Sequence, residues 1–155
     1  MHTIVSRCEE DTRRLGARVG ALLRAGDVVL LTGDLGAGKS VMARGIASGM
    51  GVTGPMPSPT FTLMTSYTAA QGMLYHLDLY RLEDAQAYWD SGLDEWVGGD
   101  GVALVEWPER AEEMLPARHL RVSLTYGEQE GERHIALTPC GGFALAMPGM
   151  GEKSV

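Results

Sequence analysis

A glycine-rich turn between an apolar run and an amphipathic segment constrains the fold of this chain more than any other feature. The apolar run, residues 28–31, is typical of a strand buried on both faces. The turn, GDLGAGKS at residues 33–40, matches G-x-x-x-x-G-K-[ST] at every fixed position. Met42, Ile46 and Met50 follow at spacings of four, as on one face of a helix. A strand, a glycine loop and a helix in this order predict a parallel α/β sheet.

This loop has the composition needed to bind nucleotide phosphates. Its glycines allow several backbone N–H groups to point at one anion, and the following helix adds the positive end of its dipole. Lys39 supplies a cation for the outer phosphates, and the Ser40 hydroxyl can ligate Mg²⁺. The predicted ligand is therefore a nucleoside triphosphate. The expected nucleotide-binding residues in this segment are Gly33, Asp34, Leu35, Gly36, Ala37, Gly38, Lys39, Ser40 and Val41.

A phosphate-binding loop also needs an acid close to Mg²⁺, usually at the end of a neighbouring apolar strand. Glu106 ends the apolar run VALVE, where an ionised side chain has few purely structural uses. Asp78, in YHLDLYR, faces the same side as His76 and Tyr80 by the two-residue period of a strand. Asp78 could instead be a solvated acid on an edge strand. His76 is expected either to orient Asp78 or to line the site.

Two more segments are candidates for the same site. The loop SPTFT at residues 58–62 lies where switch loops occur, so Thr60 or Thr62 could touch the γ-phosphate or its Mg²⁺. A proline-stiffened connection is the alternative. Trp107 follows Glu106 directly, and it either borders the nucleotide or is a core or rim aromatic.

The remaining segments predict helices and antiparallel hairpins around the parallel strands. Ser6 and Glu9 have the S-x-x-E form of a capping box, which predicts a helix start there. Residues 83–96 have a helical pattern that is interrupted at Gly92. Two pairs of segments predict hairpins, namely 62–69 with 72–82 and 119–127 with 132–139. The predicted fold is a single P-loop NTPase-like α/β domain with a largely parallel sheet.

Length and composition limit the organisation and the location of the protein. The 155 residues suit one domain, which we place at residues 1–139, with a Gly- and Met-rich, flexible tail at 140–155. No apolar run approaches the ~18 residues that span a bilayer, and no signal peptide is expected. Cys8 and Cys140 match no metal or redox spacing. These features predict a cytoplasmic protein.

The charge of the chain bears on its contact with nucleic acid. The net charge is −7, and the basic residues are scattered along the sequence. Binding to nucleic acid requires clustered Lys and Arg, because affinity comes from neutralising phosphates. Any action on nucleic acid is therefore expected to pass through a partner.

Four blocks, GDLGAGKS, SPTFTL, HLDLYRL and VEWPER, occur in an order and at spacings that resemble the TsaE (YjeE) family. These are small bacterial ATPases needed to form threonylcarbamoyladenosine in tRNA, and the resemblance covers residues 6–138. It implies that Lys39 and Ser40 are the loop lysine and hydroxyl and that Thr60 and Thr62 are the switch-loop threonines. It also implies that Asp78 and Glu106 organise Mg²⁺ and water. The catalytic residues so implied are Asp78, Glu106 and Thr60, and the metal ligands are Ser40, Asp78 and Glu106.

The resemblance also implies partners. Family members act on TsaD, which transfers the threonylcarbamoyl group to the tRNA adenosine beside the anticodon, and on its paralogue TsaB. They hydrolyse ATP and meet tRNA only through that complex. The main alternative is a small-molecule kinase that uses the same loop, with Arg110, Arg118 and Arg121 as an arginine lid. A GTP-driven switch is disfavoured, because no N/T-K-x-D block is present. A nucleotide-binding module without turnover stays open.

Overall fold

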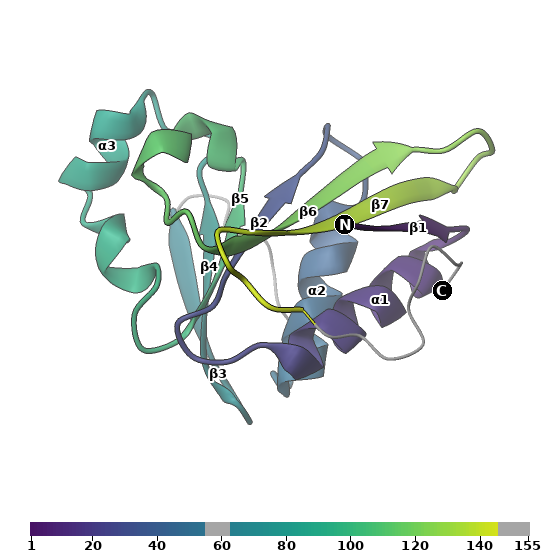
Figure 1. The fold of residues 1–155 in the computed structure, drawn as a ribbon, viewed down its shortest axis with the longest axis horizontal. Coiled ribbons are helices and arrows are strands. Elements are labelled where there is room, and N and C mark those ends of the chain that lie inside the picture. The colour runs from purple at the N-terminus through teal and green to yellow at the C-terminus, as the bar shows by residue number, and fades with distance from the viewer. Residues whose placement is uncertain (55–62, 146–155) are drawn as a thin grey trace.

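Strands from both halves of the chain build one mixed sheet in the computed structural model, which describes residues 1–54 and 63–145. Seven strands lie in the order β1-β7-β6-β2-β5-β4-β3 within this part of the chain (Figure 1). Their bounds are His2–Ser6 for β1, Val28–Thr32 for β2, Met64–Ala69 for β3, Gly72–Asp78 for β4, Val102–Glu106 for β5, His119–Tyr126 for β6 and Arg133–Cys140 for β7. The predicted hairpins are confirmed as β3–β4 and β6–β7.

The four central strands are parallel, and their register determines which residues meet at the end of the sheet. β2 pairs in parallel with both β5 and β6, and β4 pairs in parallel with β5. Asp78 is the register partner of Glu106, which is in turn the partner of Leu31 near the end of β2. The carboxyl ends of β2, β4 and β5 therefore lie side by side. This arrangement confirms the predicted P-loop NTPase-like α/β class.

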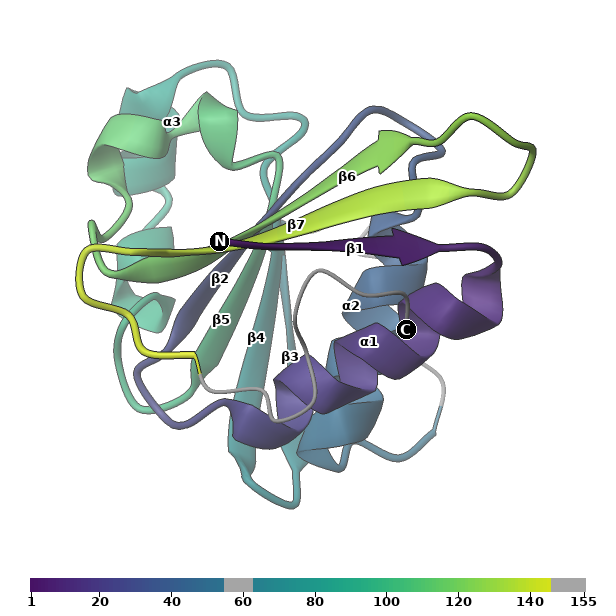
Figure 2. The same cartoon turned by 45° about the vertical axis from the view of Figure 1, so that its right-hand side comes forward.

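Helices cover both faces of the sheet. The helices α1 (Glu9–Leu22) and α2 (Lys39–Met50) lie together on one face, and α3 (Ala85–Asp90) lies on the other (Figure 2). Alternate residues of β2 point to the two sides, so that Leu31 packs toward α1 and α2 while Leu30 packs toward α3. Gly92 separates α3 from a short 3₁₀ helix, as the interrupted pattern predicted.

Glycines allow α1 and α2 to come unusually close. A Cβ atom at Gly20 of α1 would lie 2.1 Å from the carbonyl oxygen of Ile46 in α2. A Cβ atom at Gly49 of α2 would lie 2.0 Å from the carbonyl oxygen of Ala17 in α1. Both distances are too short for any side chain, so the two helices touch backbone to backbone. This contact fixes the axis of α2, whose first residue is Lys39.

The beginning of the chain differs from the prediction in two respects. Residues 2–6 form strand β1, which was not predicted and which pairs with β7. The predicted capping box is wrong, because α1 begins at Glu9 with Cys8 as its N-cap and without a side-chain capping bond. Pairing with Arg133 holds Ser6 in the strand, where its hydroxyl donates to the Cys8 carbonyl oxygen at 2.9 Å.

Sheet and core extend beyond residue 139. β7 includes Cys140, and Phe143 packs into the core with 6% of its surface exposed. The rest of the predicted tail, residues 146–155, lies outside the described residues. Within the described ranges, no helix combines the length and the apolar character needed to cross a membrane.

Candidate nucleotide-binding site

The loop between β2 and α2 has the backbone shape that its glycines predict. Gly33, Gly36 and Gly38 have φ angles of 151°, 81° and 106°, a region that side chains disfavour. Gly38 is the N-cap of α2, and its carbonyl oxygen accepts from the N–H of Met42 at 2.9 Å. The loop therefore presents the amino end of a twelve-residue helix to the end of the sheet.

Lys39 is a buried cation with two close neighbours. Its side chain is the first of α2, and only 6% of the residue is exposed. The ammonium Nζ donates to the Gly33 carbonyl oxygen at 2.6 Å and lies 3.5 Å from the ring centroid of Trp107. Burial lowers the pKa of Lys39, while the negative charges of Glu106 and Asp78 oppose that shift. The cation is thus held at the loop by a carbonyl dipole, an aromatic face and nearby acids.

Two carboxylates lie beside this lysine at the ends of neighbouring strands. Glu106 is 4% exposed, whereas Asp78 is half-buried and accepts from the N–H of Tyr80 at 3.0 Å. Burial raises the pKa of Asp78, and the charge of Glu106 adds to this shift, while the bond from Tyr80 opposes it. Two acids that repel each other and are partly desolvated favour the binding of a cation between them.

His76 does not orient Asp78, and that alternative is wrong. Its Nε2 lies 2.6 Å from Oε2 of Glu106, and the imidazole is almost fully buried. The strand register explains this contact. His76 is the register partner of Leu104 on β5, and Glu106, two residues farther along β5, lies on the same face, so that its long side chain extends to the imidazole. Asp78 turns instead toward the backbone of Tyr80.

Trp107 borders the site in a strained conformation. Its φ of 56° makes it the one non-glycine residue with a positive φ in the described part of the chain. This backbone turn directs the indole over Lys39 and against Tyr80, whose ring centroid is 4.9 Å away. Left-handed backbone at a bulky residue is uncommon and clusters at functional sites.

Loop, acids and tryptophan surround one cavity of about 370 Å³. It is lined by Glu9, Leu35, Gly36, Gly38, Lys39, Ser40, Val41, Asp78, Glu106 and Trp107. Of the predicted nucleotide-binding residues, Gly33, Asp34 and Ala37 do not line it. Asp34 is exposed, and Ala37 is buried beneath the loop. Thr60 and Thr62 lie outside the described residues.

Sequence reasoning missed three residues near this cavity. Glu9 enters from the first turn of α1, and Tyr126 and Arg133 contact the loop from the β6–β7 hairpin. No local spacing reveals them, because they lie far from the loop in sequence and are brought to it by strand pairing.

The donors in the cavity suit a hard cation. The hydroxyl of Ser40 and the carboxylates of Asp78 and Glu106 are oxygen ligands of the kind that Mg²⁺ prefers. Across the described residues, no three His, Cys, Asp or Glu side chains come together as a metal site. Mg²⁺ at nucleotide sites commonly takes one or two carboxylates together with phosphate oxygens. The residues present therefore fit Mg²⁺ delivered with a nucleotide.

The arginines that a kinase lid would require do not converge on this cavity. Arg118 pairs with Asp27 at 3.2 Å, and Arg121 pairs with Glu112. The guanidinium of Arg110 lies 5.7 Å from the ring centroid of Tyr80. None of the three arginines lines the cavity.

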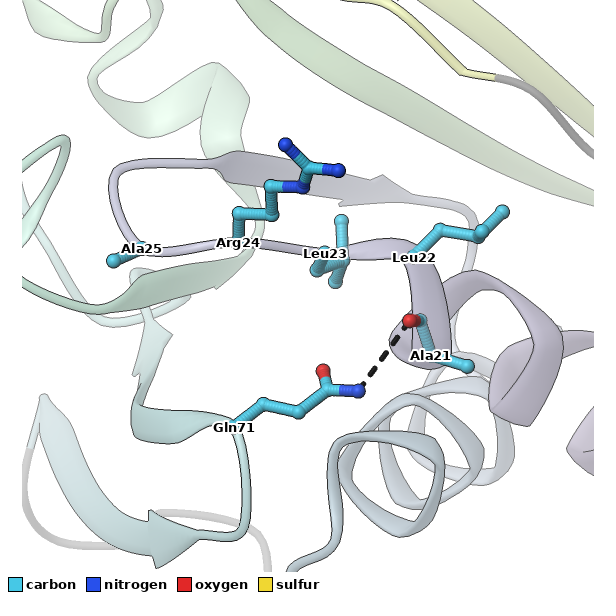
Figure 3. Close-up of a pocket in the computed structure, with 6 residues that line it drawn as sticks. All are labelled: Ala21, Leu22, Leu23, Arg24, Ala25 and Gln71. Atoms are coloured by element: carbon cyan, nitrogen blue, oxygen red, sulfur yellow. Dashed lines mark hydrogen bonds between the residues drawn. The ribbon is translucent and has the colours of Figure 1, made fainter.

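A second hollow, of about 380 Å³, lies at the carboxyl end of α1 (Figure 3). Gln71 reaches into it and donates to the Ala21 carbonyl oxygen at 3.3 Å, while the Arg24 guanidinium points away from Gln71. Its other lining residues are alanines and leucines. It therefore has no acid, nucleophile or glycine loop comparable with the first cavity.

Comparison with known proteins assigns this arrangement to one group. The family model described as "Threonylcarbamoyl adenosine biosynthesis protein TsaE" matches residues 6–135. Proteins named tRNA threonylcarbamoyladenosine biosynthesis protein TsaE are similar to this chain in Nostoc sp. and Bacillus subtilis. The Nostoc protein is 43% identical over 134 residues, 84% of this chain and 82% of its own. The Bacillus protein is 42% identical over 132 residues, which cover 85% of this chain and 82% of the Bacillus protein.

The fold comparison agrees. The crystal structure of YdiB from Bacillus subtilis superposes with a TM-score of 0.75 at 35% sequence identity. The match covers 90% of this chain and 85% of that one.

Proposed function

Since this chain belongs to the TsaE family of tRNA threonylcarbamoyladenosine biosynthesis proteins, we propose that it binds ATP with Mg²⁺ in the 370 Å³ cavity and hydrolyses it. One observation carries this proposal. The buried Lys39 and the neighbouring acids Asp78 and Glu106 line one cavity at the amino end of α2. A cationic loop and two acids are the parts that phosphoryl transfer to water requires.

Each residue has a proposed role that follows from its position. The backbone N–H groups of the loop bind the phosphates, and Lys39 exchanges the Gly33 carbonyl for a phosphate oxygen. Ser40, Asp78 and Glu106 would hold Mg²⁺, which would supply positive charge to the developing charge on the phosphates. Glu106 also orients the attacking water, because its carboxylate is fixed by His76 at 2.6 Å. Trp107 forms one wall of the nucleotide site.

We further propose that the ATPase serves as an accessory to TsaB and TsaD in the cytoplasm. The net charge of −7 supports contact with tRNA through these partners rather than directly. No arginine lines the cavity in the described part of the chain, so the arginine that commonly adds to the stabilisation of transition-state charge is lacking there. Hydrolysis is therefore slow in the isolated protein, and the partners accelerate it by acting on the segment that contains Thr60 or by supplying the missing arginine.

Steady-state phosphate release at saturating ATP and Mg²⁺, with TsaB–TsaD titrated in, tests this function. We expect weak activity alone and a marked rise with the partners; such gains reach ~10³–10⁵ in other P-loop enzymes. Thr60→Ala should lose mainly the rise, and Glu106→Gln should lose both. Rapid turnover that is indifferent to TsaB–TsaD would contradict the proposal and favour the kinase alternative.

A further inference from the structure

The β6–β7 hairpin extends past the end of β2 and lies beside the phosphate loop (Figures 1 and 2). The last register pair between β2 and β6 is Thr32 with Ser123, and their hydroxyls are 2.9 Å apart. β2 ends at that point, whereas β6 continues to Tyr126. On the edge opposite β7, the final residues of β6 therefore run along the loop instead of along β2.

Side chains of this hairpin hold three consecutive carbonyl groups of the loop. The Tyr126 hydroxyl donates to the Leu35 carbonyl oxygen at 2.8 Å. Arg133 donates from Nη2 to the Gly36 carbonyl oxygen at 3.2 Å and from Nε to the Ala37 carbonyl oxygen at 3.1 Å. The guanidinium carbon also lies 4.6 Å from the Tyr126 ring centroid, which ties the two side chains together. We call Tyr126 and Arg133 the loop brace.

The contact between hairpin and loop is close as well as polar. A Cβ atom at Gly36 would lie 2.8 Å from the Tyr126 hydroxyl oxygen. A Cβ atom at Gly33 would lie 2.8 Å from the backbone carbonyl oxygen of Leu124. Gly33 and Gly36 thus lack side chains on the side of the loop that faces the hairpin, and this allows the hairpin to approach closely.

Arg133 is turned away from a role in binding phosphate. Its third nitrogen, Nη1, donates to the Glu132 carbonyl oxygen at 2.9 Å, so all three nitrogens already have backbone acceptors. The side chain is absent from the lining of the 370 Å³ cavity. A peptide whose carbonyl is bound on the outer side of a curled loop directs its N–H toward the inner side, because the peptide unit is planar and trans. Of the N–H groups paired in this way with the three carbonyls, that of Ala37 donates to the Asp34 carbonyl oxygen at 3.0 Å, so those of Gly36 and Gly38 are the ones directed toward a phosphate.

We propose that Tyr126 and Arg133 are positioning residues that hold the loop carbonyls outward and thereby set the N–H groups to receive nucleotide phosphates. The inference rests on the proposed binding of nucleotide at this loop. Without the brace, the loop must be ordered by the nucleotide itself, and that cost appears as weaker binding. The affinity for ADP and ATP falls together, while turnover at saturation changes little.

The test measures the dissociation constant of MgADP by calorimetry and the melting temperature of the nucleotide-free protein. Tyr126→Phe removes one neutral hydrogen bond and should weaken binding about two- to tenfold. Arg133→Met removes a charged donor pair and should weaken it about ten- to a hundredfold. Arg133→Lys keeps the charge but not the forked geometry, so it should restore only part of the affinity.

Matched controls lie on the same hairpin. Thr125→Val alters the residue next to Tyr126 and removes a hydroxyl that donates to the His134 carbonyl oxygen, and Arg121→Lys alters an arginine farther along β6 that pairs with Glu112. Both variants should bind as the wild type does. Wild-type affinity in Tyr126→Phe and Arg133→Lys, or a lower melting temperature with unchanged affinity, would overturn the inference.

Lys39→Ala separates the two proposals. If it alone loses binding, the brace is wrong and the site stands; if it binds normally, the nucleotide site itself is wrong.

Discussion

At the scale of single residues, the site places charged side chains of both signs in a largely buried environment. Lys39 and Glu106 are both almost fully buried, and each has a close polar partner, the Gly33 carbonyl and His76 respectively. Among the described residues, the Asp78 carboxylate has only the backbone N–H of Tyr80 as a hydrogen-bond donor, and burial raises its pKa. Asp78 is therefore the member of the site whose charge is least well compensated in the nucleotide-free protein.

Neutralising this residue should stabilise the nucleotide-free protein. Since the folded state raises the pKa of Asp78, it holds the proton more tightly than the unfolded chain does. Its contribution to the free energy of unfolding therefore decreases as the pH rises from the ordinary aspartate pKa through the raised value. Asp78→Asn should melt at a higher temperature than the wild type at pH 7, and the difference should shrink as the pH falls toward 4.

Thermal melts of both proteins from pH 4 to 8, without nucleotide or metal, measure this difference. Asp90→Asn, which removes an exposed carboxylate on α3, is the control and should leave the melting temperature unchanged at every pH. In the same preparations, ATP hydrolysis by Asp78→Asn should collapse. A destabilised variant that retains normal specific activity would identify Asp78 as a structural acid.

At the scale of elements, the α1–α2 pair determines where the loop lysine stands. The two helices meet through Gly16 and Gly20 on one side and Gly45 and Gly49 on the other. Each glycine faces backbone of the opposite helix, so no rotamer change could accommodate a side chain. A displacement of α2 would move its amino end, and with it Lys39, relative to β4 and β5.

Gly20→Ala should therefore destabilise the protein despite the better helix propensity of alanine. Alanine gains about 1 kcal/mol in a helix, but its Cβ would lie 2.1 Å from the Ile46 carbonyl oxygen. Overpacking against backbone that cannot yield costs up to about 3 kcal/mol, so after this gain the free energy of unfolding should fall by up to about 2 kcal/mol. Urea denaturation measures the change. Ser48→Ala, an exposed position on α2, should stay within about 0.5 kcal/mol of the wild type.

Local signals predicted the elements that carry the chemistry, and long-range contacts account for what they missed. The strand–loop–helix at residues 28–50, the interruption at Gly92 and both hairpins follow from glycine positions and periodicity. β1 was missed because its pairing partner, β7, lies more than a hundred residues away in sequence. Pairing also explains the wrong capping box, since Ser6 belongs to that strand. The contact between His76 and Glu106 depends on the register between β4 and β5. The pattern of residues within a single strand carries no information about that register.

At the scale of the whole molecule, the site joins elements that lie far apart in the sequence. The loop belongs to β2 and α2, and the acids belong to β4 and β5. The strands β2, β4 and β5 and the helix α2 are therefore linked at this one end of the sheet. A ligand that bridges the loop and the acids binds the folded chain only and stabilises all of these elements together.

MgADP should therefore raise the melting temperature of the entire domain. At a concentration one hundred times its dissociation constant, a ligand adds about 2.7 kcal/mol to the free energy of unfolding. For a chain of this size that corresponds to about 5–10 °C. Differential scanning calorimetry should show one transition that shifts as a unit. Lys39→Ala should show almost no shift at the same concentration, whereas an equal shift would place the nucleotide elsewhere.

The sheet order also determines when each strand can find its partner while the chain is being synthesised. β2 and its loop leave the ribosome early, but β2 can pair only after β5 and β6, between which it lies, have been synthesised. In the same way, β1 has its partner only after β7, which ends at Cys140, has been synthesised. Pairings between such distant segments form late, because the intervening chain must first be closed into a loop. Until residue 140 has been synthesised, β1 lacks its partner β7, and unpaired strands recruit other chains. Premature termination before the last hairpin would thus yield a product prone to aggregate.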